Sequence, residues 1–393
     1  MRTTIALALL GLCALALADP TPTPTTNVNQ YGKQYKDGTK VNLYEKDGLE
    51  LTGFELLGKI IEASPDSPNT RFYGYLQVIA HQVLGYSAHP VHQYKVHPSA
   101  LEHFETALRD PLFYQFYKRI TYYFLQYKSH LPHYTYTQLN YAGVKIENVH
   151  VDKLVTFFDH FDFDITNALY MQEQEFENEE FQVVARQFRL NHKPFTYKIN
   201  VNSDKANDVV VRVFLGPKYD EQGHEIPLNE NRVNFVELDK FKYTLQAGKN
   251  VIERNSQQGE TVKDRTTFRA LYKHVMAAYN GQEKFHLDMS EAHNGFPNRF
   301  VLPKGKQGGQ VFQFYVYISP YAPATQVYGS TFDEAISAGV GSGSRYIDVL
   351  PFGFPFDRQI KDEHTFFVPN SYVEDVVIIH KTESELNTAH YHH

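Results

Sequence analysis

The sequence has no tryptophan and very little sulfur. Its 393 residues include one Cys and four Met, against 28 Tyr and 29 Phe. Aromatic residues therefore make up 15% of the chain although the largest aromatic type is missing. The packing of a hydrophobic core does not require such a skew. The composition suggests that the amino acids themselves are part of what this protein supplies.

Signatures of the common kinds of catalysis are missing as well. The sequence contains no G-x-S-x-G, H-E-x-x-H, Walker or C-x-x-C motif. The glycine-rich run Gly339–Gly343 lacks the G-x-G-x-x-G spacing and the strand-to-helix context of a dinucleotide site, so we interpret it as a loop. These absences favour a protein that is not an enzyme.

Positive charge is not in excess. Lys and Arg number 38 against 45 Asp and Glu, which gives a formal charge of −7, and no long basic run interrupts that balance. Attraction to a phosphate backbone is therefore not expected, and nucleic acid is excluded as a predicted partner. No apolar stretch reaches the roughly 20 residues that a membrane span needs, so no membrane association is expected.

The first 18 residues have the pattern of a secretory signal peptide. Arg2 is followed by the apolar run Ile5–Leu17 and by the cleavage signature Ala16-Leu17-Ala18. We expect the mature protein to begin at Asp19 and to be secreted. Cys13, the single cysteine, lies inside the signal peptide. The mature chain is therefore expected to have neither disulfides nor thiolate chemistry.

The rest of the chain is expected to consist of a tether, a helical part and a β part. Residues 19–40 begin with alternating Pro and Thr and are predicted to be an extended tether. Residues 41–143 contain three segments with helical apolar spacing, at about 49–62, 70–86 and 111–127, the last with Pro111 at its start.

From residue 144 to 393 the apolar period changes to two. Phe195, Tyr197, Ile199 and Val201 alternate with polar residues, and Phe312 to Ile318 alternate in the same way. Gly and Pro separate the short strands. This pattern predicts an antiparallel sandwich or barrel, so the fold class is α+β.

Two groups of potential metal ligands have simpler interpretations. Asp159, Asp162 and Asp164 lack the glycine and the bidentate Glu of a calcium loop, which favours a solvated turn before a strand. The second group consists of histidines. Four of them lie close together in a stretch that prolines interrupt, so a rigid metal site is not expected there. Three more lie at the C-terminus and are expected to bind divalent ions only weakly. The histidines concerned are His89, His92, His97 and His103 in the stretch and His390, His392 and His393 at the terminus.

Several ordered blocks resemble the arthropod hemocyanin superfamily between about residues 41 and 381. The aromatic enrichment resembles its insect hexamerins of the arylphorin type. The blocks are Arg109–Tyr114, Val144–Val149, Thr156–Asp159, Phe214–Tyr219, Glu237–Phe241, Leu302–Gly305, Gly353–Arg358 and Val368–Tyr372. The resemblance implies a copper-type helical middle domain followed by an immunoglobulin-like β-sandwich.

The resemblance also identifies the positions of one copper half-site, which needs three imidazoles. Its first ligand position falls on Gln77, its second on His81 and its third on Tyr117. A neutral amide and a phenol are poor substitutes for imidazole, so neither copper binding nor any other cofactor is expected. The first domain of the family and its other copper half-site have no counterpart in this sequence, so the family's assembly with related hexamerin subunits is in doubt for a short form.

The resemblance therefore implies a secreted, non-enzymatic storage protein of insect hemolymph that holds amino acids for later growth. The alternative is a hemolymph carrier or interaction protein that binds a small hydrophobic ligand or hormone in an aromatic pocket. Tyrosine and phenylalanine are scattered from Tyr31 to Tyr391 instead of being concentrated in one stretch. This distribution favours storage.

Overall fold

The computed structural model describes residues 26–28, 34–36, 53–62, 67, 70–74, 76–85, 99–101, 107, 110–164, 166, 172, 174–175, 182–259, 268–284, 298–323, 347–351, 353–382 and 385. The chain forms two compact units. The helical unit comprises Met1–His130 and Ile165–Gln182, and the β unit comprises Leu131–Asp164 and Val183–His393. The units divide before residue 144, where the strand periodicity begins.

The helical unit contains the three predicted helical segments. They correspond to α2 (Gly53–Glu62), α3 (Thr70–Tyr73) with α4 (Leu76–Gly85), and α7 (Pro111–Ser129). The second segment is interrupted because Gly74 adopts a left-handed backbone with φ of 70°. In α7, the Asp110 carboxylate accepts a hydrogen bond from the Leu112 N–H, so the N-terminus begins where Pro111 predicts it.

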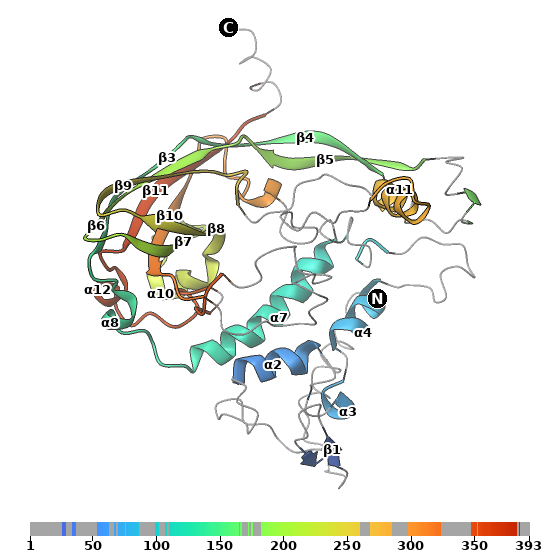
Figure 1. Cartoon of the computed structure of the whole chain (residues 1–393), viewed down its shortest axis with the longest axis horizontal. Coiled ribbons are helices and arrows are strands. Elements are labelled where there is room, and N and C mark those ends of the chain that lie inside the picture. The colour runs from blue at the N-terminus through green and yellow to red at the C-terminus, as the bar shows by residue number, and fades with distance from the viewer. Residues whose placement is uncertain are drawn as a thin grey trace. The chain divides into compact units, whose positions relative to one another are not determined.

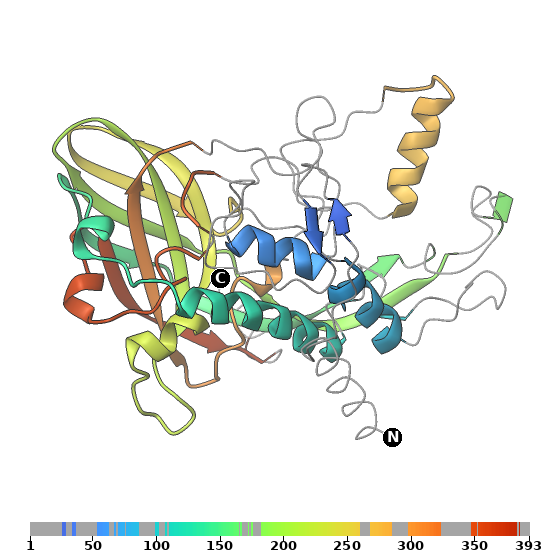
Figure 2. The ribbon, with the colours of Figure 1, turned by 90° about the horizontal axis from the view of Figure 1, so that it is seen from below.

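Aromatic contacts join α2 to α7, which lie side by side in Figure 2. The Phe54 ring centroid is 5.0 Å from that of Phe124 and 5.9 Å from that of Tyr127. Leu56 is 3% exposed and Leu57 is half-buried. Ile61, one turn further along α2, is buried as well.

A small hairpin lies within the stretch predicted to be a tether. Strand β1 (Thr26–Val28) pairs antiparallel with β2 (Gln34–Lys36). An uninterrupted extended tether from residue 19 to 40 is therefore wrong, because these backbone groups find partners in each other.

The β unit has two sheets (Figure 1). A six-stranded sheet has the order β5-β4-β11-β10-β7-β8, and a three-stranded sheet has the order β3-β6-β9. The strands are β3 (Val144–Val151), β4 (Leu154–Asp164), β5 (Val184–His192), β6 (Thr196–Ser203), β7 (Asn207–Pro217), β8 (Val236–Leu245), β9 (Gly248–Asn255), β10 (Gln310–Pro320) and β11 (Ser371–His380). Shorter elements are α8 (Tyr136–Leu139), α10 (Leu228–Asn231), η2 (Arg232–Asn234), α11 (Phe268–Tyr279), η3 (Asn298–Phe300) and α12 (Glu363–Phe366).

Among the described strands, the pairing is antiparallel, as predicted, except between β4 and β11. The last strand, β11, lies between β10 and β4 and pairs with β4 in parallel. The α+β class with a β-sandwich is confirmed, and the six-stranded sheet is mixed. Among the described residues, no helix is both long enough and apolar enough to cross a membrane.

The predicted alternation is confirmed in the core between the sheets. Phe195, Tyr197, Ile199 and Val201 are each at most 2% exposed and belong to the larger cluster of buried residues. Burying one such side chain contributes about 1.5–3 kcal/mol relative to leaving it in water. This cluster is the main source of stability in a unit that has no disulfide.

Strand β10 is buried on both faces, which its period of two does not predict. Phe314 and Val316 point into the larger cluster, while Tyr315 and Tyr317 belong to a second cluster. Leu139 of α8 and Phe366 of α12 cover that second face together with Phe354, Phe356 and Val368. The second face therefore explains why so many aromatic side chains can be buried in one β unit.

Candidate functional site

The three copper-ligand positions lie on two helices of the helical unit. Gln77 and His81 lie one helical turn apart on α4, and Tyr117 lies on α7. The Tyr117 ring centroid is 4.4 Å from that of Phe113 and 5.5 Å from that of Phe116. The tyrosine thus packs among aromatic rings of its own helix. These positions offer one imidazole where the copper pattern needs three, so the residues present do not fit a copper ion.

The described residues contain no cluster of three or more His, Cys, Asp or Glu side chains that could hold a metal. Asp159, Asp162 and Asp164 lie inside β4, so the predicted turn is wrong. Asp162 forms an ion pair with Arg186 at 2.7 Å, and Asp159 accepts a hydrogen bond from the Asn191 amide at 3.0 Å. Cross-strand pairing, not metal binding, accounts for these two carboxylates.

Other predicted candidates lie outside the described residues. They are Gly339–Gly343, the terminal histidines His390, His392 and His393, and the histidine stretch His89, His92, His97 and His103.

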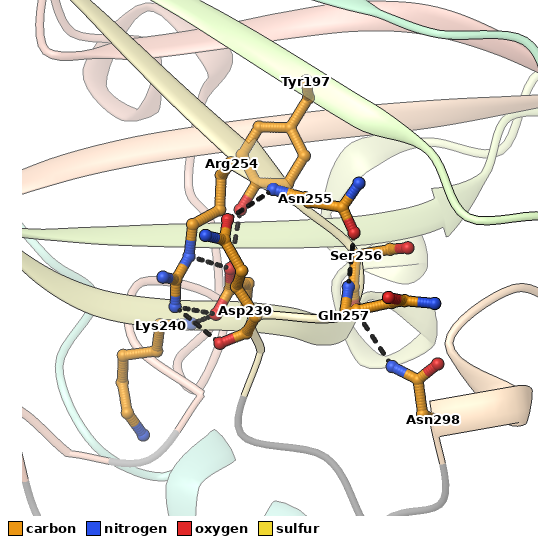
Figure 3. Close-up of polar contacts among 9 residues, drawn as sticks. Tyr197, Asp239, Lys240, Arg254, Asn255, Ser256, Gln257 and Asn298 are labelled. Atoms are coloured by element: carbon orange, nitrogen blue, oxygen red, sulfur yellow. Dashed lines mark hydrogen bonds and ion pairs between the residues drawn. The ribbon is translucent and has the colours of Figure 1, made fainter. Parts of the chain in front are cut away.

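A polar network connects the two sheets of the β unit (Figure 3). Tyr197 of β6 donates to Asp239 of β8 at 2.8 Å, and Arg254 of β9 donates to the same carboxylate from Nε at 2.9 Å. The backbone N–H of Lys240 donates to the other carboxylate oxygen at 2.9 Å. Asp239 therefore joins a strand of the larger sheet to two strands of the smaller sheet.

Burial sets the electrostatics of this network. Tyr197 is 2% exposed, and burial together with the Asp239 charge raises the pKa of its phenol well above the usual value. The phenol stays protonated and acts as a donor. Arg254 also lies over the Phe241 ring, with its guanidinium carbon 4.3 Å from the centroid. The carboxylate oxygens already have donors, so the network is built to hold the sheets together, not to react.

Asn370, in the block Val368–Tyr372, is a second buried polar junction. Its amide N–H groups donate to the carbonyls of Leu139 and Ile318 at 3.0 and 2.8 Å, and its oxygen accepts from the Tyr141 N–H at 2.9 Å. Tyr317 also donates to the Leu139 carbonyl, at 2.6 Å. Hydrogen bonds thus join Leu139 and Tyr141, just before β3, to β10 and to the residue that precedes β11.

Three further blocks of the resemblance, Phe214–Tyr219, Leu302–Gly305 and Gly353–Arg358, have roles in packing. The rings of Phe235 and Phe356 stack with centroids 4.3 Å apart. A Cβ at Gly216 would lie 2.8 Å from the Phe235 ring, and a Cβ at Gly305 would lie 2.6 Å from the Ile378 carbonyl oxygen. Both positions need glycine because the neighbouring group occupies the space of a side chain.

Arg212 and Asp348 form a fully buried ion pair in the β unit. Their side chains are each 2% exposed, and Nη2 lies 2.6 Å from Oδ1. Arg212 also donates from Nη1 to the Ser319 hydroxyl at 3.1 Å. The two residues are far apart in sequence, and charge patterning gives no signal that they meet.

A shallow hollow in the β unit is the best candidate for a ligand pocket among the described residues. Its enclosed volume is only about 10 Å³, roughly the room for one water molecule. Pockets for small molecules are usually about 300–1,000 Å³. The lining residues are Tyr134, Leu139, Pro355, Gln359, Ile360, Lys361, Asp362, Thr365 and Phe366. The hollow is small for a hydrophobic hormone.

Sequence reasoning missed the inter-sheet network, the Asn370 junction and the buried ion pair. Each joins residues that become neighbours only through the sheet pairing. The block Val368–Tyr372 was singled out by resemblance alone, and nothing in its composition indicates that Asn370 binds three backbone groups.

Comparison with known protein families gives two adjacent matches. Residues 133–380 match the family described as "Hemocyanin, ig-like domain". Residues 27–124 match the family described as "Hemocyanin, copper containing domain". The change from one match to the other falls in the stretch where the two compact units divide.

Curated relatives and solved structures agree with these matches. The chain is 47% identical to a hexamerin of Blaberus discoidalis, over 86% of this chain and 46% of the relative. It is 45% identical to arylphorin subunit A4 of Calliphora vicina, over 88% of this chain and 45% of the relative. The structure of a scorpion hemocyanin superposes with a TM-score of 0.66 at 26% identity, over 91% of this chain and 55% of that chain. The chain spans about half the length of the curated relatives it matches.

Proposed function

Because the chain belongs to the hemocyanin superfamily, on its hexamerin branch, we propose that it is an amino-acid storage protein, rich in aromatic residues and secreted into insect hemolymph. The observation that carries this proposal is the combination of the arylphorin similarity with 28 Tyr and 29 Phe in 393 residues. A store needs no reactive site. The buried polar groups of Asp239 and Asn370 already have donors and acceptors within the fold.

A storage role requires the protein to be abundant in hemolymph. The protein should be among the major hemolymph proteins at the end of larval feeding and should decline while adult tissues form. Quantitative mass spectrometry of staged hemolymph measures this directly. A protein that stays at trace level throughout development would contradict storage.

The same proposal holds that the protein is not an enzyme and carries no copper. Its support is the replacement of two of the three ligand positions, by Gln77 and Tyr117. The test is metal analysis after copper loading and dialysis, with absorbance in the peroxide-to-copper region. We expect no stoichiometric copper, and the variant with Gln77→His and Tyr117→His should also fail to form a dinuclear centre. A retained copper pair in the wild-type protein would contradict the proposal.

Assembly with related subunits is the second part of the proposal. On α4, Ile79 and Val83 lie one turn apart and are 45% and 50% exposed. We infer that these two side chains lie on the surface that another subunit covers. Native mass spectrometry of the hemolymph protein should therefore find it together with hexamerin subunits. A strictly monomeric protein in native hemolymph would exclude this part.

The carrier hypothesis remains the alternative. The small hollow bounded by Tyr134, Leu139 and Phe366 is the only observation that favours it. Extraction of the native protein with organic solvent, followed by mass spectrometry of the extract, distinguishes the two functions. A stoichiometric small hydrophobic molecule would favour a carrier, and an empty extract favours storage.

A further inference from the structure

The exposed side of α7 combines two cations with two tyrosine rings. Tyr114 and Tyr122 are 47% and 46% exposed, and Lys118 and Arg119 between them are exposed as well. Tyr114, Lys118 and Tyr122 are spaced four residues apart, so they follow one side of the helix. The guanidinium carbon of Arg119 lies 5.9 Å from the Tyr122 ring centroid. We call these four side chains the α7 face.

The positive charge of the α7 face is not balanced within its own helix. The 19 residues of α7 contain no Asp or Glu. Asp110, just before the helix, accepts a hydrogen bond from the Leu112 N–H and caps the N-terminus. No carboxylate of the described residues forms an ion pair with Lys118 or Arg119. These two exposed cations are therefore available to carboxylates of another chain.

The sequence contains a segment of complementary composition at residues 172–182. It has five glutamates, two phenylalanines and no Lys or Arg. Blocks of about five or more like charges repel one another and are often interaction segments. Cations beside aromatic rings offer such a segment both counter-charges and ring contacts. The residues concerned are Glu173, Glu175, Glu177, Glu179, Glu180, Phe176 and Phe181.

One chain carries both complementary surfaces, which is the condition for a symmetric pair. In a pair related by a twofold axis, the α7 face of each copy contacts the acidic segment of the other, so the same contact forms twice. Both surfaces belong to the helical unit, so the contact requires no particular arrangement of the two units. The formal charge of −7 makes two copies repel each other overall, and a cationic face reduces that repulsion locally.

We propose that the α7 face binds the acidic segment of residues 172–182 from a second copy of this chain. Exposed ion pairs are individually weak and are screened by salt, so the contact is reversible and strongest at low ionic strength. The contact goes beyond the proposed storage function. It also differs from the proposed assembly with other subunits, which uses Ile79 and Val83 of α4.

The first test is sedimentation velocity of the purified full-length protein over a range of concentrations. The wild-type protein should self-associate at about 50 mM salt, and the association should weaken about tenfold at about 500 mM salt. The double variant Lys118→Glu and Arg119→Glu should lose about tenfold in association at the lower salt. The matched control is Lys205→Glu with Lys249→Glu, which changes the net charge equally at exposed lysines of the β unit and should associate like the wild-type protein.

The second test identifies the occupant of the α7 face with synthetic peptides of residues 172–182, read by fluorescence anisotropy. The natural peptide should bind the wild-type protein, and a peptide in which Gln replaces the five glutamates should not. A peptide in which Lys replaces them should bind the double variant Lys118→Glu and Arg119→Glu instead, because the charges are then exchanged.

Three results overturn the proposal. They are a wild-type protein that stays monomeric at low salt, a double variant that associates like the wild-type protein, and a natural peptide that binds no better than its Gln version. The first and third of these are measured on the wild-type protein, so they do not depend on how any variant folds. None of the three bears on storage, which the abundance of the protein in hemolymph tests separately.

Discussion

Among the described residues, both clusters of buried apolar side chains lie in the β unit. In the β unit, Phe314, Val316 and Ile318 are fully buried in a core shared by two sheets. In the helical unit, α4 exposes Ile79 and Val83, and α7 exposes Tyr114 and Tyr122 by almost half. The described residues thus give the β unit its own core, whereas the exposed side chains of α4 and α7 lie where contact with a further chain is proposed.

The largest expected effect is loss of the buried ion pair in the β unit. Asp348→Ala leaves the Arg212 guanidinium buried without its carboxylate partner, which should lower the free energy of unfolding by about 3–5 kcal/mol. Urea denaturation followed by circular dichroism measures the change. Asp162→Ala is the matched control, because it breaks an exposed ion pair and should leave stability almost unchanged. If both variants lose the same free energy of unfolding, burial does not determine how much each ion pair contributes to stability.

The next effect concerns where the self-sufficient β unit begins. We expect limited proteolysis to remove the residues before about Leu131 and to leave a resistant, cooperatively melting product that starts there. The reason is that Leu139 is 2% exposed and its carbonyl accepts from Tyr317 and Asn370. A fragment that starts at Ala142 should fold but should be less stable by about 2–4 kcal/mol.

Thermal and urea unfolding of the two fragments measures this difference. If the two fragments are equally stable, the β unit begins at residue 144, as the sequence periodicity predicts. A resistant product that keeps the helices and loses the strands would contradict the contrast between the units.

Alkaline unfolding should show a smaller effect that belongs to the β unit alone. Burial raises the pKa of Tyr317 to about 12, from a usual value of 10.0. The unfolded chain therefore ionises first, and the contribution of this group to stability is present below about pH 10 and is lost as the pH rises towards 12. In the variant Tyr317→Phe, the free energy of unfolding should fall less steeply with rising pH, by about 1.4 kcal/mol per pH unit.

The matched control for this measurement is Tyr279→Phe, since Tyr279 is 83% exposed. Urea midpoints measured between about pH 9 and 12 give both slopes. If the free energy of unfolding of Tyr317→Phe changes with pH as steeply as that of the wild-type protein, other buried tyrosines such as Tyr197 account for the loss of stability at alkaline pH.

The smallest expected effect on folding is at the exposed face of α4. Val83→Ser should change the free energy of unfolding by no more than about 0.5 kcal/mol, because the side chain is half-exposed. The same variant should weaken assembly with other subunits, which analytical ultracentrifugation measures. A large loss of stability with unchanged assembly would show that this face is covered within its own chain.

Periodicity predicted the regular parts of both units because it reports a local property. Phe195 to Val201 alternate in sequence and in burial, and Pro111 begins α7 where a proline is favoured. It did not predict the parallel insertion of β11 beside β4, since the hydrophobic period is the same for either neighbour. Nor did it predict that Asp159 and Asp162 lie within a strand, where partners on β5 compensate for their polarity.

The copper-ligand positions were predictable only through a family resemblance. Gln77 and His81 have helical spacing, which the structure confirms on α4, but spacing alone does not relate them to Tyr117 on another helix. The junctions at Asp239 and Asn370 were not predictable, because they depend on strands brought together by the fold.

Storage is the central claim, and the fate of the protein's tyrosine tests it most directly. The hemolymph protein labelled with ring-deuterated tyrosine should be injected into late larvae, and newly made tissue and cuticle should be followed by mass spectrometry. If the protein is a store, the labelled protein disappears during development while deuterated tyrosine appears in other proteins. Persistence of the intact labelled protein into the adult, with no label elsewhere, would contradict it.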